Sequence, residues 1–339
     1  MTIKIEDSLT FSDVLLKPKF SNIKSRSEVS LKVKINDFIF SNPIIPANMP
    51  SIVGKEVLEF CAEKEMLCFM HRFSSIDNQL TDLHFLNERF GEKVFNNIGV
   101  SLGVKKEDKA NLSKFIDAGV KIFCIDIAHG HSQMCLDMIK FIRSHTKTAL
   151  VVAGNVATKH GAQALWTEGA DIVKVGIGSS KICTTRLVAG SGVPQLSALI
   201  DIVENKDSKQ YLISDGGAQI PGDFVKALCL SDMVMTGSFF AGAPEVPGEV
   251  IEIDGKEFKR YDGSSTIGKN GKRVEGVKSL VPVQMSISHL LDKLIEGIQS
   301  GASYQGVNDI NKLQHEPVFV RLSHGGTVET SIHDVKVIG

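Results

Sequence analysis

From about residue 43 onward, the sequence alternates between short apolar runs and longer amphipathic stretches. Eight of the short runs are rich in β-branched residues, and their hydrophobicity is continuous rather than alternating. Continuous hydrophobicity indicates strands that are buried on both faces, which is typical of a parallel sheet covered by helices. The expected strands are 43–49, 67–72, 96–103, 122–129, 150–156, 171–178, 211–217 and 232–238.

Segments with helical periodicity separate these strands, and a further one follows the last strand at 285–299. Eight consecutive β-α units predict an α/β fold of the TIM (β/α)8 barrel type. A doubly wound sheet is the alternative, but the GxGxxG turn expected after its first strand is absent. The 339 residues contain no second hydrophobic rhythm and no low-complexity linker, so we expect one domain over 1–339. The Gly-, Ser- and Lys-rich stretch 261–282 is not expected to contribute to the core.

Charge and cysteine content restrict the class of partner and the compartment. The formal net charge is -1 with no block of like charges, so no nucleic-acid or anionic membrane partner is expected and small molecules fit better. Six cysteines without a CxxC pair, and no secretory segment behind the start, predict reduced thiols and a cytoplasmic location. Every apolar run is far shorter than the roughly 20 residues that cross a bilayer.

Polar residues and glycines gather where the expected strands end, which is where barrels of this type carry function. Any one of them can be a turn or capping residue, but their joint occurrence indicates a site. Glycine-rich turns after the last three strands expose backbone N–H groups and predict a phosphorylated substrate. The residues at these strand ends are Asn48, Met49, His71, Arg72, Asp126, Asn155, Asp215, Gly216, Gly217, Gly237 and Ser238.

The stretch "GIGSSKICTT", residues 176–185, places Cys183 in a glycine-rich loop. A thiolate is a strong nucleophile, and neighbouring hydroxyl groups can pass protons during the formation and breakdown of a covalent adduct. The alternative is a buried cysteine in an ordinary connection. The other cysteines lie inside expected helices or strands and are predicted to be small buried hydrophobes: Cys61, Cys68, Cys124, Cys135 and Cys229.

The motifs "GIGSSKICTTRLVAGSGVPQLSA", "ISDGG", "MVMTGSFFAG" and "VEG" resemble those of the IMP dehydrogenase and GMP reductase family. The likeness spans essentially the whole chain, beginning with "LTFSDVLLKPKF". It implies that Cys183 adds to carbon 2 of the purine ring of a nucleoside monophosphate and forms a thioimidate.

The family contains one reductive and one oxidative reaction, and the resemblance favours the reductive one. The oxidative enzymes usually carry an inserted regulatory domain pair, and they activate water with an Arg-Tyr pair on a long flap. This sequence has no such insertion, and no such pair within the tip of its shorter flap at about 239–282. "NIKSRSEV" resembles the reductive branch, and Arg26 suits the 2′-phosphate of NADPH.

The resemblance therefore implies NADPH-dependent reductive deamination of GMP to IMP and ammonia, a reaction of purine salvage. One alternative is oxidation of IMP to XMP with NAD by a dehydrogenase without regulatory domains. The other is a relative that binds purine nucleotides without turnover.

Carried over position by position, the resemblance implies a role for each of several residues. The implied catalytic residues are Cys183, Thr185 and Glu275. The implied substrate-binding residues are Asp215, Gly216, Gly217, Gly237, Ser238, Tyr261, Gly263, Ser264 and Gly276. The implied cofactor-binding residues are Ser25, Arg26, Arg72, Asp126, Ile127, Ala128, Ser300 and Gly301.

Two further implications concern assembly and a cation. Ser25 and Arg26 would reach the cofactor of a neighbouring subunit in an expected homotetramer. A potassium ion would bind the backbone carbonyls of Gly178, Ser180, Cys183 and Arg186. Ser179 and Ser180 replace the Pro and second Gly of the family's usual pattern, so a strained loop path or an altered cation site is expected there.

Overall fold

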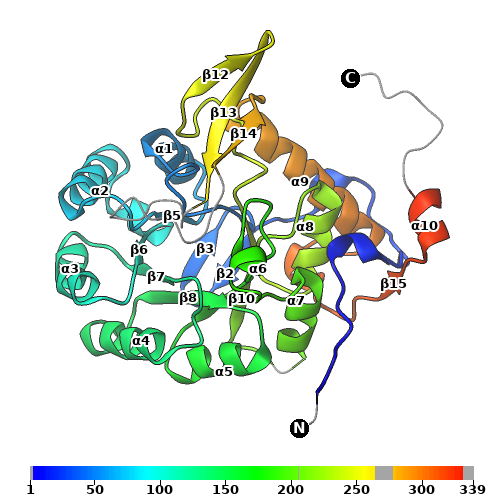
Figure 1. Ribbon diagram of the computed structural model, residues 1–339, viewed down its shortest axis with the longest axis horizontal. Coiled ribbons are helices and arrows are strands. Elements are labelled where there is room, and N and C mark those ends of the chain that lie inside the picture. The colour runs from blue at the N-terminus through cyan, green and yellow to red at the C-terminus, as the bar shows by residue number, and fades with distance from the viewer. Residues whose placement is uncertain (1–2, 205, 264–277, 331–339) are drawn as a thin grey trace.

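The computed structural model describes residues 3–204, 206–263 and 278–330, and its centre is an eight-stranded parallel sheet curved into an almost closed barrel (Figure 1). Each of the eight expected strands is present, which confirms the predicted TIM-barrel class. The barrel strands are β4 (Ile44–Pro46), β5 (Cys68–Met70), β6 (Ile98–Leu102), β7 (Ile122–Asp126), β8 (Leu150–Val156), β9 (Ile172–Val175), β10 (Tyr211–Asp215) and β11 (Met233–Thr236).

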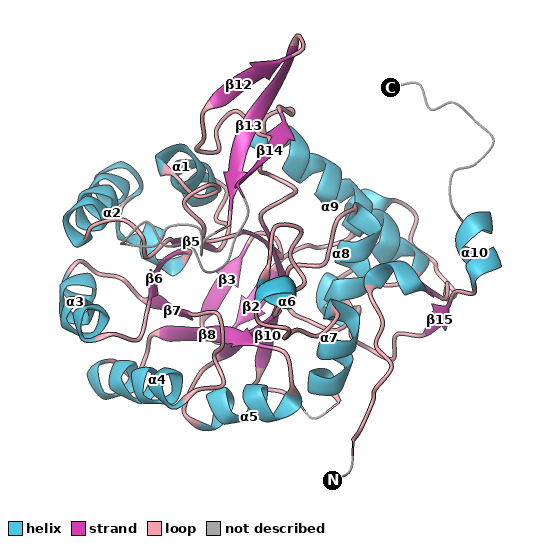
Figure 2. Ribbon diagram, viewed as in Figure 1, coloured by secondary structure: helices cyan, strands magenta, loops and turns pink. Residues whose placement is uncertain are grey.

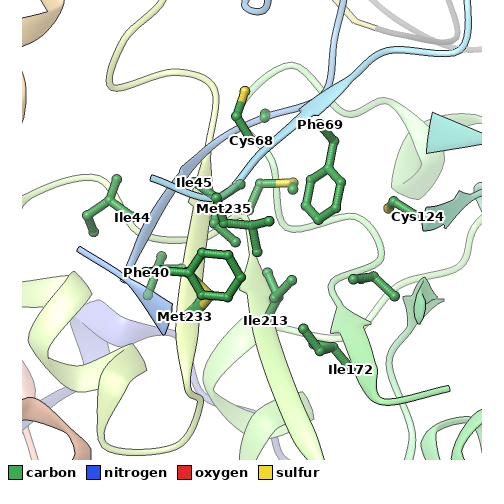
Figure 3. Packing of buried hydrophobic residues seen from close by; sticks show 14 of the residues in the cluster. Phe40, Ile44, Ile45, Cys68, Phe69, Cys124, Ile172, Ile213, Met233 and Met235 are labelled. Atoms are coloured by element: carbon green, nitrogen blue, oxygen red, sulfur yellow. The ribbon is translucent and has the colours of Figure 1, made fainter. Parts of the chain in front are cut away.

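The hydrogen-bonded order of the sheet is β4-β11-β10-β9-β8-β7-β6-β5, and the two end strands contact each other. All the neighbouring pairs are parallel, so the carboxyl ends of all eight strands meet at one mouth of the barrel. At the other end, Phe40 lies beside Met233 near the start of β11 (Figure 3). Phe40 and Met233 are fully buried.

Amphipathic helices surround the barrel and cover the outer face of the sheet (Figure 2). Several begin at a side-chain cap, as at Ser75, Thr158 and Ser286, each of which accepts a hydrogen bond from a backbone N–H of the first turn. In the described part of the chain, no helix is long and apolar enough to cross a membrane. The helices of the expected β-α units are α1 (Lys55–Glu63), α2 (Ile76–Phe90), α3 (Lys106–Asp117), α4 (Gln133–His145), α5 (Lys159–Thr167), α7 (Gln195–Val203), α8 (Pro221–Leu228) and α9 (Ile287–Tyr304).

Several short elements were not expected from the pattern of apolar residues, because each is too short to show a helical or strand periodicity. A hairpin precedes the barrel, and an antiparallel strand pair joins residues near both chain ends on the outside of α8 and α9 (Figure 1). These elements are η1 (Phe11–Asp13), β1 (Val14–Leu16), η2 (Arg26–Glu28), β2 (Val33–Ile35), β3 (Phe38–Phe40), η3 (Glu92–Asn96), α6 (Thr185–Val188), η5 (Ile310–Lys312), β15 (Phe319–Arg321) and α10 (His324–Glu329).

A three-stranded antiparallel sheet projects from the barrel next to α1 and α9 (Figure 1). It consists of β12 (Val250–Ile253), β13 (Lys256–Asp262) and β14 (Lys278–Pro282). The expectation that 261–282 stays out of the core is wrong for Tyr261, which is only 2% exposed. Neighbouring Lys259 is equally buried, because its Nζ donates to the carbonyl oxygens of Ala243 (2.9 Å), Pro244 (3.0 Å) and Val246. Alternate residues of β13 therefore fix this sheet to the loop that follows β11.

Candidate active site

Cys183 lies in the loop between β9 and α7, at the mouth of the barrel. Its backbone N–H donates to the carbonyl oxygen of Ser180 (3.1 Å), and its Sγ lies 3.2 Å from Thr185 Oγ1. Cys183 is partly exposed, whereas the other five cysteines are buried as predicted. Burial raises the pKa of the Cys135 and Cys229 thiols to about 12, so these thiols stay protonated near neutral pH. The structure thus sets Cys183 apart by its accessibility.

Two glycines bring the cysteine loop against the turn that follows β10. At Gly176 φ is +152°, and a Cβ there would lie well inside 3.0 Å of the Asp215 carbonyl oxygen. At Gly216 φ is +92°, and a Cβ would lie 2.8 Å from Ser179 Oγ. Ser179 Oγ also donates to the Asp215 carbonyl oxygen (3.2 Å). Only glycine permits this approach, so the cysteine loop and the turn after β10 are in direct contact.

The strain expected at Ser179 and Ser180 is absent, because neither residue has a positive φ. Gly176 and Gly178 take the positive-φ positions of this loop instead. The aliphatic part of Arg186 packs on Gly178, where a Cβ would lie 2.8 Å from Arg186 Cγ. The loop path therefore needs no left-handed backbone at the two serines. The cation site at Gly178, Ser180, Cys183 and Arg186 stays a prediction.

A buried ammonium group joins two aspartates at the centre of the mouth. Lys174 Nζ of β9 lies 2.8 Å from Asp126 Oδ1, at the end of β7, and 2.9 Å from Asp215 Oδ2, at the end of β10. Asn155 Nδ2, on β8, donates to the same oxygen of Asp215 (2.8 Å). Sequence reasoning missed Lys174 because it counted "DIVKVGIG" as one apolar run. The available signal was a single charge inside an otherwise apolar strand.

The charges of this cluster stabilise one another. Burial disfavours the ammonium of Lys174, but the two aspartates outweigh it and hold the pKa of Lys174 above its ordinary value. Burial also disfavours the carboxylate of Asp126, yet Lys174 and then Arg72 lower the pKa of Asp126 below 3.8. Lys174 and Asp126 are therefore both ionised near neutral pH, and the ammonium also lies 2.9 Å from the carboxylate of Asp215.

The predicted cofactor residues Arg72, Asp126, Ile127 and Ala128 come together at the mouth. Arg72 Nε donates to the carbonyl oxygen of Asp126 (2.9 Å). The backbones of Ile127 and Asn155 are linked by an N–H···O bond of 2.9 Å. Within the described residues Asn155 Oδ1 is buried without a hydrogen-bond partner. The ends of β5, β7 and β8 are thus locked together beside the Lys174 cluster.

The glycine turns after β10 and β11 meet the root of the projecting sheet. A Cβ at Gly237 would lie 2.7 Å from the Tyr261 hydroxyl oxygen, so this glycine makes room for the phenol. Burial, and then the charge of Asp215, raise the pKa of Tyr261, which stays protonated near neutral pH. Gly237, Tyr261 and Asp215 therefore lie in one region, and the predicted residues Gly216, Gly217, Ser238 and Gly263 follow them closely in the sequence. The predicted residues Ser264, Glu275 and Gly276 lie outside the described residues.

The remaining predicted cofactor residues occupy another part of the surface. Ser25 precedes η2, which begins at Arg26 and packs on α9, and Ser300 and Gly301 belong to α9 itself. Helix α9 lies on the outside of the barrel beside α8 (Figure 1). Ser300 and Gly301 line a cavity of about 300 Å³ between these helices. The structure thus groups these four residues on the flank of the barrel and away from its mouth.

The fold and the mouth define a (β/α)8 barrel with a loop-borne cysteine, a hydroxyl beside it and glycine turns suited to a phosphate. A family model described as "IMP dehydrogenase / GMP reductase domain" matches residues 8–333. The chain belongs to this family.

Three known proteins illustrate the similarity. A GMP reductase of Staphylococcus epidermidis is 36% identical over 311 residues, covering 90% of this chain and 93% of that protein. A GMP reductase of Onchocerca volvulus is 34% identical over 343 residues, covering 95% of this chain and 93% of that protein. A crystal structure of a Trypanosoma brucei GMP reductase variant, in complex with guanosine 5′-monophosphate, superimposes with a TM-score of 0.88 at 24% identity, covering 98% and 99% of the two chains. The last comparison supports the fold.

Proposed function

We propose that this protein is a GMP reductase that converts GMP to IMP and ammonia with NADPH. The observation that carries the proposal is the accessible Cys183, with Sγ 3.2 Å from Thr185 Oγ1, at a mouth bordered by glycine turns. The curated relatives that cover most of the chain at 34–36% identity bear this name. The proposal includes a role in purine salvage.

In the proposed reaction, the Cys183 sulfur forms a bond to carbon 2 of GMP, and the bond from carbon 2 to the exocyclic amine breaks. The amine leaves as ammonia after it receives a proton, which gives a thioimidate on Cys183. Thr185 Oγ1 is close enough to the sulfur to pass that proton. Glu275, outside the described residues, is proposed as the acid that supplies Thr185.

The rest of the mouth positions the nucleotide. Asp215 accepts hydrogen bonds from the ribose hydroxyls, and Lys174 and Asn155 hold its carboxylate in place. Backbone N–H groups of Gly217, Gly237 and Ser238 donate to the phosphate, where the absence of side chains at the glycines allows close approach. These assignments place carbon 2 within reach of the cysteine loop.

The residues at the mouth fit a dinucleotide. Arg72, Asp126, Ile127 and Ala128, which lie together at the ends of β5 and β7, would hold its nicotinamide end. When bound, NADPH supplies the hydride that replaces the sulfur at carbon 2. Because Ser25, Arg26, Ser300 and Gly301 lie on the flank, we propose that they serve the cofactor of a neighbouring subunit in a homotetramer. The loop carbonyls of Gly178, Ser180, Cys183 and Arg186 are the proposed ligands of a potassium ion.

Absorbance at 340 nm tests the reaction. Purified protein with GMP and NADPH should lower the absorbance and release one ammonia per NADPH consumed. A rise in absorbance with IMP and NAD in the presence of potassium, and no change in the first mixture, would establish the dehydrogenase instead. GMP binding without either change would establish a protein that only binds nucleotides.

A pair of cysteine variants tests the mechanism. Cys183→Ala should abolish turnover and still bind GMP, because the nucleotide contacts do not depend on the sulfur. Cys135→Ala is the control: this buried cysteine of α4 lies outside the site, so its variant should keep the turnover number of the native protein. Full activity of the Cys183→Ala variant would refute covalent catalysis.

A further inference from the structure

Lys174 is a deeply buried charge at the mouth. Its side chain is 3% exposed, whereas those of Asp126 and Asp215 keep 19% and 20% of their surface exposed. The ammonium therefore lies beneath the two carboxylates, which face the mouth. A buried lysine is unfavourable unless it is paired, so this position is maintained only by its two partners.

The two carboxylates come from different strands and have different proposed ligands. Asp126 ends β7 beside Arg72, on the side assigned to the cofactor, while Asp215 ends β10 on the side assigned to the nucleotide. Lys174, on β9, donates to both. One ammonium group thus fixes the orientation of a carboxylate in each pocket, and a change in one carboxylate changes the field and the hydrogen bond at the other.

We propose that Lys174 is a positioning residue that couples the nucleotide pocket to the cofactor pocket by sharing its ammonium between Asp215 and Asp126. The inference rests on the proposed function for the identity of the two ligands. It goes beyond that function because it predicts that each pocket senses the charge state of the other. Coupling of this kind is reciprocal for binding free energies.

The main test is the dissociation constant of GMP, measured by calorimetry without cofactor. Asp126→Asn removes a charge that the nucleotide is not proposed to touch. In that variant the ammonium pairs with Asp215 alone and withdraws it from the ribose, so the dissociation constant of GMP should rise at least threefold. An unchanged constant would overturn the proposal.

Asp171→Asn is the matched control. Asp171 precedes the other end of β9, and its Oδ2 pairs with the guanidinium of Arg143 (2.5 Å). This variant also loses a partly buried carboxylate from an ion pair, yet it should leave the dissociation constant of GMP unchanged. An equal effect of Asp171→Asn and Asp126→Asn would reduce the result to general destabilisation and overturn the proposal.

Substitution of the lysine adds a pH readout. Lys174→Met should raise the dissociation constant of GMP at least tenfold. It should also shift the loss of GMP binding at acidic pH to higher pH, because both carboxylates lose their cation. Lys174→Arg, which keeps the charge, should leave this loss at the same pH as in native protein. Equal weakening at every pH in Lys174→Met would indicate structural damage alone and overturn the proposal. Among the described residues, the ionisable groups that face this cluster include Cys124 on β7, Arg72 after β5 and Tyr261 on β13.

The outcomes separate this inference from the proposed function. Native protein that binds GMP but does not consume NADPH would refute the reductase, while the Asp126→Asn result would still decide the coupling. Native turnover with no effect of Asp126→Asn on GMP would refute the coupling and leave the reductase in place. Native protein that does not bind GMP would overturn both.

Discussion

Substitution of Gly176 by alanine should be among the most damaging single-methyl changes in this chain. The residue has φ +152°, a conformation that L side chains rarely adopt, and this costs about 1–3 kcal/mol. The new Cβ would also overlap the carbonyl oxygen of Asp215, and overpacking adds about 1–3 kcal/mol. Because the overlapping atom belongs to the backbone of β10, no side chain can move aside. We therefore expect a loss of about 2–6 kcal/mol in the free energy of unfolding.

Gly190→Ala separates the two contributions. Gly190 lies in the same loop at φ +64°, and a Cβ there would meet no atom within 4 Å. Only the conformational cost remains, so this variant should lose about 1–2 kcal/mol. Gly178→Ala should fall between the two, because its Cβ would meet Arg186 Cγ, which belongs to a flexible side chain.

Denaturant unfolding followed by tryptophan fluorescence measures these differences. The only tryptophan, Trp166, is 8% exposed in α5, a helix that packs on β9, and it therefore reports on this part of the barrel. A total stability of about 5–15 kcal/mol makes the expected loss in Gly176→Ala easy to resolve. If Gly176→Ala were no less stable than Gly190→Ala, the close contact between the cysteine loop and β10 would be refuted.

Three further outcomes are expected. A thiol reagent should label native protein once and Cys183→Ala not at all, since the other cysteines are buried. Mass spectrometry counts the labels, and rapid labelling of a second cysteine would contradict the packing. The lowered pKa of Asp126 contributes stability above about pH 4, and this stability is lost as the pH falls through the folded-state pKa. The free energy of unfolding, measured between pH 7 and 3, should therefore fall less steeply in Asp126→Asn than in native protein. Gly301→Ala places a Cβ 2.5 Å from Val225 Cγ2 and should lower the free energy of unfolding by about 1–3 kcal/mol. In a double-mutant cycle Val225→Ala should relieve part of this loss, and strict additivity of the two changes would argue against the contact.

The barrel was predictable from the sequence because a parallel strand that is buried on both faces needs apolar residues at consecutive positions, a pattern visible within a few residues. Runs such as "LVVAGNV" and "DMVMTGS" have apolar residues at consecutive rather than alternate positions, and all eight expected strands form the sheet. The separation of Cys183 from the other cysteines was local too, since the others lie within helical or strand periodicity. The family motifs around Cys183 also lie on contiguous residues, so the resemblance to the family could be recognised from the sequence alone.

The tertiary structure decided the contacts between residues that are distant in the chain. Lys174 reads as one charge in an apolar run, and only the meeting of β7, β9 and β10 supplies the two carboxylates that allow it to be buried. Tyr261 and Lys259 belong to a polar stretch, and only the loop after β11 supplies the cover and the carbonyl oxygens that bury them. Ser300 and Gly301 lie on the flank because α9 packs against α8. Periodicity along the chain indicates whether a residue is buried, but the partners that balance a buried charge depend on which strands become neighbours.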